Sequence, residues 1–145
     1  MILRELVLSD YYKGYYDLIK QLSVIDDTSY ENFELIFNKC KKNKYHFIYI
    51  LEDNNRIVAS ITLLLEPKFS CDFISYLEDL VIDKEYRNKG LEKKLIKEIR
   101  QKAYKNKCYI AFFNCSKEKV PWLENSGAKR TGICMRIDKR DKMYN

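Results

Sequence analysis

A short basic segment between two apolar stretches carries the residue types best suited to chemistry. Residues 87–92 read R-N-K-G-L-E. A turn that leads into a helix points several backbone N–H groups at one spot, at the positive end of the helix dipole, where a pyrophosphate fits. Gly90 lets the backbone approach a ligand closely, and the arginine and lysines add positive charge. The segment predicts an anion-binding loop, with a solvated basic turn as the alternative that the residues alone leave open.

The flanking residues predict a strand before this loop and a helix after it. Leu77 and residues 80–82 are apolar, which is typical of a strand, and from residue 91 to 99 apolar residues recur at helical spacing. The carboxylates of Glu78 and Asp79 belong to the predicted strand. Because side chains alternate along a strand, we expect these two carboxylates on opposite faces of the sheet.

Length and composition limit the possible classes of protein. The 145 residues predict one domain, 1–145, and the 46% of apolar residues are enough for a core. No apolar run is long enough to cross a membrane, and the first residues do not resemble a signal peptide. The net charge of +6 favours anionic partners. Since no nucleic-acid motif accompanies this charge, we expect small phosphorylated ligands and not nucleic acid.

The cysteines and the histidine argue against a metal site. The chain has 5 cysteines, widely spaced and without a C-x-x-C motif, and its single histidine is His46. Reduced thiols in a cytoplasmic protein are the simpler interpretation, and no metal is expected.

The order of predicted elements indicates an α/β, or α+β, domain of three layers, with helices on both faces of a mixed central sheet. The predicted strands span residues 2–8, 45–51, 56–65, 73–82, 108–114 and 130–137. The predicted helices begin after Ser9, Thr28 and Gly90 and at Lys117, and Gly127 caps the last of them. Residues 53–55 are predicted to form a hairpin turn.

The sequence resembles a known family at its anion-binding loop. Arg87-x-x-Gly90 directly after a strand is similar to the acyl-coenzyme-A loop of the GNAT N-acetyltransferases, whose pattern is Gln/Arg-x-x-Gly-x-Gly/Ala. The order of the elements also resembles the GNAT fold, from Leu3 to about Ile137. That resemblance implies acetyl-CoA as a cosubstrate.

Two further motifs resemble one branch of that family, the glucosamine 6-phosphate N-acetyltransferases. They are Glu78-Asp79 and residues 107–109, K-C-Y. The resemblance implies transfer of acetyl from acetyl-CoA to the amine of D-glucosamine 6-phosphate, in UDP-N-acetylglucosamine biosynthesis. It further implies a homodimer whose second chain helps to close the sugar-phosphate site.

The same resemblance implies roles for individual residues. The strand before the loop bulges away from its neighbour, and the pantetheine of acetyl-CoA pairs with its end. Residues implied to bind acetyl-CoA are Leu80, Val81, Ile82, Arg87, Asn88, Lys89, Gly90, Leu91 and Glu92. Residues implied to bind the amino-sugar phosphate are Ser23, Lys68, Glu78, Asp79, Tyr109 and Ile110. Residues implied to be catalytic are Glu78, Asp79 and Asn114, since the substrate ammonium must lose a proton before it attacks.

Three residues depart from the pattern of the branch. Glu92 replaces a small residue beside the pyrophosphate, Asn114 replaces an acidic residue, and Leu123 replaces the tyrosine that protonates or stabilises the leaving thiolate. The branch's C-terminal basic contact falls on Asp138. These departures keep two alternatives open: a GNAT enzyme that acetylates another amine, such as a protein N-terminus or a polyamine, and a weakly catalytic acetyl-CoA-binding protein.

Overall fold

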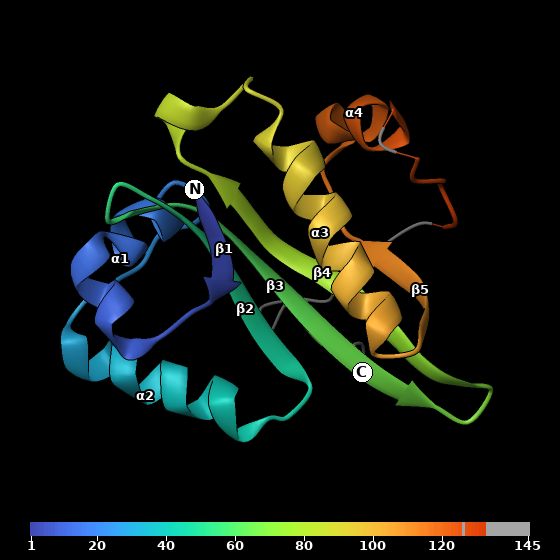
Figure 1. Ribbon diagram of the computed structural model, residues 1–145, viewed down its shortest axis with the longest axis horizontal. Helices are drawn as coiled ribbons and strands as arrows, with labels where there is room; N and C mark the ends of the chain where they lie inside the picture. Colours follow the sequence, from blue (N-terminus) through green and yellow to red (C-terminus); the bar gives the residue numbers. More distant parts are fainter. Residues whose placement is uncertain (126, 133–145) are drawn as a thin grey trace, which may run out of the picture. The chain divides into compact units, whose positions relative to one another are not determined.

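A five-stranded mixed sheet organises residues 1–113 (Figure 1). The computed structural model describes residues 1–125 and 127–132. The strands are β1 (Ile2–Glu5), β2 (His46–Asp53), β3 (Arg56–Lys68), β4 (Cys71–Ile82) and β5 (Cys108–Phe113). They lie side by side in chain order, and every neighbouring pair is antiparallel except β4 with β5, which is parallel. The predicted mixed sheet is therefore confirmed.

The structure bears on only part of the last predicted strand, residues 130–137. Residues 130–132 are not in a strand. Residues 133–137 lie outside the described residues, as does Asp138.

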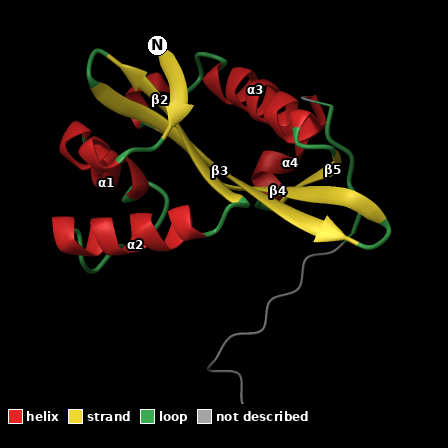
Figure 2. Ribbon diagram, turned by 60° about the horizontal axis from the view of Figure 1, so that its bottom comes forward, coloured by secondary structure: helices red, strands yellow, loops and turns green. Residues whose placement is uncertain are grey.

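The helices of residues 1–113 cover both faces of the sheet, as predicted (Figures 1 and 2). The helices are the 3₁₀ helix η1 (Leu8–Lys13), α1 (Tyr15–Ile19), α2 (Tyr30–Lys42), the 3₁₀ helix η2 (Lys84–Tyr86) and α3 (Leu91–Lys105). Figure 2 shows α1 and α2 on one face and α3 on the other. No described helix has the length and apolar character to cross a membrane.

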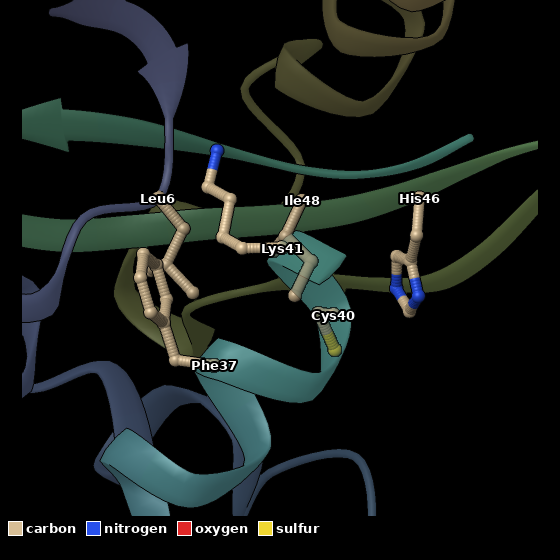
Figure 3. A pocket seen from close by; sticks show the side chains of 6 residues that line it. All are labelled: Leu6, Phe37, Cys40, Lys41, His46 and Ile48. Carbon is tan, nitrogen blue, oxygen red and sulfur yellow. The ribbon is translucent and has the colours of Figure 1, made fainter. Parts of the chain in front are cut away.

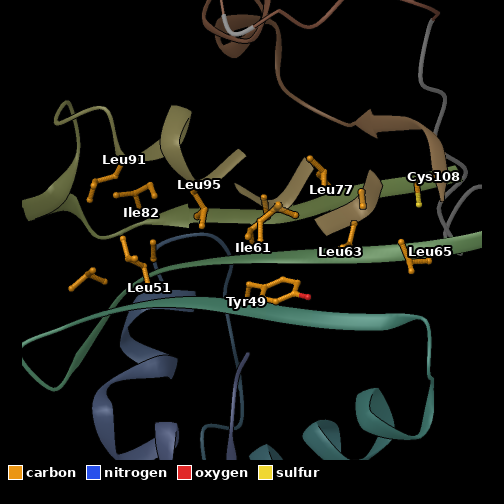
Figure 4. Close-up of a cluster of buried hydrophobic side chains, with 14 residues drawn as sticks. Tyr49, Leu51, Ile61, Leu63, Leu65, Leu77, Ile82, Leu91, Leu95 and Cys108 are labelled. Carbon is orange, nitrogen blue, oxygen red and sulfur yellow. The ribbon is translucent and has the colours of Figure 1, made fainter. Parts of the chain in front are cut away.

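Two apolar clusters hold these helices to the sheet, because β3 is buried on both faces. On one face, Ile61 of β3 packs in a cluster with Leu95 of α3 (Figure 4). On the other face, Ile50 of β2 packs in a cluster with Leu18 of α1 and Phe33 of α2. Burying one such side chain stabilises the fold by roughly 1.5–3 kcal/mol, so the two clusters fix the helix positions.

The hairpin turn between β2 and β3 forms where it was predicted. Asn54 and Asn55 have φ angles of 47° and 62°, the left-handed values that a two-residue hairpin turn of the primed type requires. Asparagine adopts these angles more readily than most residues, which explains why this turn needs no glycine.

Two local predictions are wrong in detail. The helix predicted to begin after Ser9 is instead two helices, η1 from Leu8 and α1 from Tyr15, which Gly14 separates with its φ of 82°. A Cβ there would meet only Asp17 Oδ2, at 3.8 Å, so the backbone angle and not the space requires glycine. The cap of α2 is Ser29, whose hydroxyl accepts the N–H of Asn32 at 3.2 Å, and not Thr28.

The described residues from Asn114 onward belong to a second compact unit. It contains the 3₁₀ helix η3 (Lys117–Lys119) and the helix α4 (Val120–Asn125). Gly127 has a φ of 89°, and its N–H donates to the carbonyl of Glu124 at 2.9 Å, which confirms the predicted cap. One domain over residues 1–145 remains a prediction.

Tyr15 is a polar group in the core between α1 and the sheet. Its ring lies 5.7 Å from that of Phe33, and a hydrogen bond joins its side chain to that of Ser60 on β3. Burial raises the pKa of Tyr15 to about 12, against the opposing effect of the Ser60 bond. Ionisation of Tyr15 therefore opposes the folded state.

Replacing Tyr15 with phenylalanine should change how stability depends on pH. The folded pKa of about 12 lies above the unfolded value of about 10, so the stability linked to this group is complete below pH 10. As pH rises from about 10 to 12, the wild type should lose roughly 2–3 kcal/mol that Tyr15→Phe does not lose. At pH 8 the variant should instead be less stable by about 1 kcal/mol, because the Ser60 bond is gone.

Urea unfolding at pH 8 and pH 11 measures this difference. Tyr12→Phe, at a ring that is 75% exposed, is the matched control and should follow the wild-type curve. A gap between wild type and Tyr15→Phe that is the same at both pH values would contradict the assignment.

Candidate active site

A bulge interrupts β4 at the predicted acidic pair. Val81 lies opposite Ser60 of β3 and Glu78 lies opposite Thr62, so Asp79 and Leu80 together face one residue of β3. Asp79 has a φ of 51°, which aspartate tolerates better than most side chains. The predicted bulge in the strand before the loop is thus present, and its centre is the acidic pair itself.

The bulge overturns the expectation that Glu78 and Asp79 lie on opposite faces. Glu78 is directly across from Thr62, and the Thr62 hydroxyl donates to Asp79 Oδ2 at 3.5 Å. Both carboxylates therefore lie on the face that α1 and α2 cover, and both are exposed. Strand alternation failed here because one strand holds an extra residue.

His46 of β2 faces the same region. It lies opposite Leu64, two residues from Thr62 along β3, and so shares the face of the acidic pair. Burial lowers the pKa of His46, while the charges of Asp79 and Glu78 act in the opposite direction. The acidic pair is thus close enough to the histidine for their charges to interact.

A small pocket opens beside His46 (Figure 3). Its lining residues come from α2, from β2 and from the residue that follows β1, and are Leu6, Phe37, Cys40, Lys41, His46 and Ile48. The pocket holds about 200 Å³ including its open mouth. The lining is mostly apolar and offers no cluster of cations for a phosphate.

Beyond Leu77, β4 has lost its neighbour on one side. The last β4–β5 pair is Leu77 with Phe113, whereas β4 continues to Ile82 and stays paired with β3. Within the part of the chain that the structure describes, no strand pairs with the other edge of β4 from Glu78 to Ile82. Backbone donors and acceptors on such an edge can pair with an extended ligand.

The turn η2 after β4 is fixed by a buried carboxylate. Asp83, only 2% exposed, accepts the N–H of Glu85 at 2.9 Å and bonds from Gln21 Nε2 at 3.1 Å and Arg56 Nη2 at 2.8 Å. Burial opposes ionisation of Asp83, but these donors together hold its pKa below the usual value. A charged Asp83 therefore determines the course of the chain into the loop.

Arg87, the first residue of the predicted loop, braces the backbone. Its Nε donates to the carbonyl of Ile82 at 2.9 Å, and its Nη2 donates to Gln21 Oε1 at 3.1 Å. These bonds use two of the five guanidinium donors. The ammonium of Lys89 lies 5.1 Å from the ring centre of Tyr86, a cation–π contact that holds a second positive charge beside the loop.

The end of the loop has the geometry of an anion site. Asn88 and Gly90 both have left-handed φ angles, 60° and 74°, and Gly90 is the N-cap of α3. The first N–H groups of α3 have no partner within the helix and point toward the loop. A Cβ added at Gly90 would meet nothing within 4 Å, so a ligand can approach the backbone there. Glu92 stands half-buried in the first turn of α3.

The comparison with protein families agrees with this geometry. The model of the acetyltransferase (GNAT) family matches residues 4–121. The chain belongs to the GNAT family of acetyltransferases. The predicted GNAT fold, with its open β4 edge and its helix-capping loop, is thereby confirmed.

Several relatives within this family carry one name. The glucosamine 6-phosphate N-acetyltransferase of Arabidopsis thaliana is 29% identical over 92% of this chain and 93% of its own length. Glucosamine 6-phosphate N-acetyltransferase 1 of Dictyostelium discoideum is 31% identical over 92% of this chain and 88% of its own. The crystal structure of the Arabidopsis enzyme superposes with a TM-score of 0.89 over 95% of this chain and 97% of its own, at 28% identity.

The residues predicted to contact an acceptor do not all lie together. Ser23 is exposed in the turn after α1, two residues from Gln21 and so close to the GNAT loop. Lys68 pairs with Glu66 at 2.6 Å at the far end of β3. It lies six residues from Thr62, or about 20 Å along the strand. Within one chain, Ser23 is near the segment that follows the end of β4, whereas Lys68 lies at the opposite end of the β3–β4 pair.

Tyr109 and Ile110 lie toward the same far end of the sheet as Lys68. Both are on β5, where Ile110 pairs with Ile74, and their exposed fractions are 76% and 40%. Asn114 and Leu123 belong to the second unit, in which Asn114 is exposed and Leu123 is 6% exposed. The roles of all four residues remain predictions.

The sequence analysis missed three residues that the geometry brings to the site. They are Gln21, His46 and Thr62. His46 could have been found, since it is the only histidine and belongs to a predicted strand. Gln21 and Thr62 give no signal in the sequence, because their contacts depend on segments far away along the chain. Among the described residues, no group of three histidine, cysteine, aspartate or glutamate side chains could hold a metal ion.

The bulge makes a prediction about Asp79. Asp79→Val should destabilise the protein by about 1–3 kcal/mol, because a β-branched residue at a φ of 51° is strained. Asp79→Asn should cost less than about 1 kcal/mol, since asparagine accepts both the φ angle and the Thr62 bond. Urea unfolding compares the two variants. Equal losses for valine and asparagine would mean that the backbone angle is not the constraint.

The loop makes a prediction about Glu92. Glu92→Gln should tighten acetyl-CoA binding about fivefold, since a carboxylate about 4 Å from a phosphate costs roughly 1 kcal/mol even in water. Glutamine keeps the helix propensity of glutamate, so the change isolates the charge. Calorimetric titration measures the affinity, with Glu98→Gln, about 9 Å further along α3, as the control. Weaker binding by Glu92→Gln would show that the carboxylate helps to bind the cofactor.

Proposed function

We propose that this GNAT protein transfers acetyl from acetyl-CoA to the amine of D-glucosamine 6-phosphate. The observation that carries the proposal is the pair of exposed carboxylates, Glu78 and Asp79, at the bulge where β4 also presents an open edge. The names of the relatives from Arabidopsis and Dictyostelium support the choice of acceptor. The product would feed UDP-N-acetylglucosamine biosynthesis.

The residues present suit acetyl-CoA. The pantetheine arm can pair with the backbone edge of Leu80, Val81 and Ile82. The pyrophosphate can accept bonds from N–H groups of residues 88–92 at the start of α3, with Lys89 adding positive charge. This arrangement directs the thioester toward the bulge, since both contacts follow the same end of β4.

The proposed reaction needs a neutral amine. The amine nitrogen attacks the thioester carbonyl carbon, the nitrogen loses a proton, and the carbon–sulfur bond breaks to release coenzyme A. Among the described residues, no group donates a hydrogen bond to the Glu78 carboxylate, whereas Asp79 accepts one from Thr62. Glu78 is therefore the better proton acceptor, and Asp79 the better group to orient the ammonium before it loses its proton. Asn114, which cannot act as a base, is proposed as a hydrogen-bonding residue.

The position of Lys68 supports a homodimer. Lys68, Tyr109 and Ile110 are all displaced along the sheet from the acidic pair of their own chain. We propose that they bind the sugar phosphate of a site completed by a second chain. Exposed apolar side chains on β5, including Tyr109 at 76%, fit a surface that a partner covers. The proposed partners include no nucleic acid and no membrane, and the proposed location is cytoplasmic, where free cysteines stay reduced.

Release of coenzyme A tests the function directly. Purified protein with acetyl-CoA should release the thiol fastest with glucosamine 6-phosphate, and much more slowly with glucosamine or spermidine. Turnover with another amine alone would favour a GNAT enzyme of different specificity. Binding of acetyl-CoA without turnover on any amine would favour the weakly catalytic binding protein that Glu92, Asn114 and Leu123 suggest.

Glu78→Gln tests the proposed base. Its turnover number should fall by about 10²-fold, the lower end of what one general base contributes. Asp72→Asn, an exposed carboxylate at the other end of β4, is the matched control and should leave turnover unchanged. Full activity in Glu78→Gln would mean that Asp79 or water, and not Glu78, accepts the proton.

A further inference from the structure

The side chain of Gln21 joins two segments that belong to different halves of the proposed site. Gln21 lies in the turn after α1, and its partners lie more than 60 residues away in the sequence. Its Oε1 accepts the backbone N–H of Lys84 at 3.0 Å and Nη2 of Arg87 at 3.1 Å. Its Nε2 donates to Asp83 Oδ2 at 3.1 Å. One amide thus contacts Asp83, Lys84 and Arg87, which lead into the cofactor loop.

These contacts fix the orientation of the amide. Both Lys84 N–H and Arg87 Nη2 are donors and need the oxygen, while the Asp83 carboxylate needs the NH₂ group. The reversed amide would place donors against donors and the oxygen against a carboxylate. The bond from Gln21 to Asp83 is partly buried, since Asp83 is 2% exposed, whereas the bonds from Lys84 and Arg87 are exposed to water.

Further hydrogen bonds hold the partners of Gln21 on the loop side of the contact. Asp83 is also held by Glu85 N–H and by Arg56, and Arg87 is also bound to the carbonyl of Ile82. A ligand that orders Arg87 and the residues after it therefore orders the partners of Gln21. The amide then transmits this order to the turn after α1.

The other side of the contact is the turn that carries Ser23. The N–H of Gln21 donates to Leu18 at 3.0 Å, and the N–H of Ser23 donates to Ile19 at 3.2 Å. Gln21 and Ser23 therefore belong to one hydrogen-bonded turn. The family resemblance implies that Ser23, in this turn, contacts the acceptor, and the loop is proposed to bind acetyl-CoA.

We infer that Gln21 is a positioning residue that couples the two substrates, so that binding of one at the GNAT loop raises the affinity of the acceptor turn for the other. The inference rests on the proposed function for the identity of the acceptor. A coupling of this kind is reciprocal, and couplings in proteins typically change an affinity by 5–150-fold. Three hydrogen bonds through one amide place the expected factor near the lower end, about fivefold to tenfold.

A dead-end pair of ligands measures the coupling without reaction. Coenzyme A lacks the acetyl group, so the affinity for glucosamine 6-phosphate can be titrated calorimetrically with and without saturating coenzyme A. The wild type should bind the sugar phosphate about fivefold to tenfold more tightly when coenzyme A is present. Gln21→Met keeps the length of the side chain and removes every one of its hydrogen bonds, so the ratio of the two affinities should fall to about one.

The ratio of the two affinities for glucosamine 6-phosphate, with and without coenzyme A, distinguishes a positioning role of Gln21 from a purely structural role. A residue that only supports the fold would lower the melting temperature and both affinities, and would leave the ratio unchanged. Such an unchanged ratio in Gln21→Met would overturn the inference. Gln101→Ala, at an exposed position on α3, is the control and should keep the wild-type ratio.

Amide hydrogen exchange adds a measurement that needs no acceptor. Coenzyme A alone should slow exchange at residues 19–23 in the wild type and not in Gln21→Met. If glucosamine 6-phosphate fails to bind the wild type, the proposed function is wrong, and this exchange experiment still decides the coupling. If coenzyme A does not slow amide exchange at residues 19–23 in the wild type, the inference is overturned, whatever the acceptor is.

Discussion

In β4, Asp79 and Leu80 together lie opposite a single residue of β3, Ile61. This bulge determines which face of the sheet each residue at the end of β4 occupies. Leu77 belongs to the apolar cluster under α3 and Leu80 packs against it, although the two are three positions apart along the strand and not two. An unbroken strand would turn Asp79 toward that cluster and Leu80 away from it. Burying a carboxylate among apolar side chains costs far more than a left-handed φ at one aspartate. The bulge is therefore the cheaper solution, and it brings both carboxylates to one face.

A second constraint, the buried charge of Asp83, follows directly from where β4 ends. A carboxylate that is 2% exposed must be satisfied by donors, and here they come from a backbone turn, an arginine of β3 and an amide after α1. Because these donors belong to separate segments, the carboxylate fixes their relative positions. The position of the loop that follows thus depends on the buried carboxylate of Asp83 as well as on the residues of the loop itself. Losing any one donor leaves the charge less well satisfied, so the segments around Asp83 act together.

The sequence could predict the features of this protein that local chemistry determines. Asn54 and Asn55 marked a hairpin turn, Gly90 marked the start of α3, and the loop after β4 was recognised with its family. The spacing of Leu77 and Leu80 also contained a sign of the bulge, but the carboxylates were assigned by strict alternation. Pairing across strands determines which residue bulges, and it is not visible in one strand alone.

Contacts between segments that are distant along the chain could not be predicted from the sequence. Nothing in residues 18–23 identifies Gln21 as a partner of Arg87, because the contact exists only when α1 and β4 meet in the fold. For the same reason the sequence predicted only that Arg87 binds the pyrophosphate. In the structure, Arg87 also forms hydrogen bonds with the carbonyl of Ile82 and with Gln21. The separation of Lys68 from the acidic pair likewise depends on the register of the β3–β4 hairpin.

The distribution of charge explains why an amino-sugar phosphate suits this site better than a polyamine. The chain carries a net charge of +6, yet the two carboxylates at the bulge are exposed together and interact with His46. A ligand with one cationic and one anionic end can place its ammonium near the carboxylates, while the net positive charge of the protein attracts its phosphate. A polyamine gains the first contact but brings further positive charges into a positive protein, where the long-range field repels them. The bulge thus supplies a local pair of negative charges in a protein of positive net charge, and this contrast favours a ligand that carries both signs of charge.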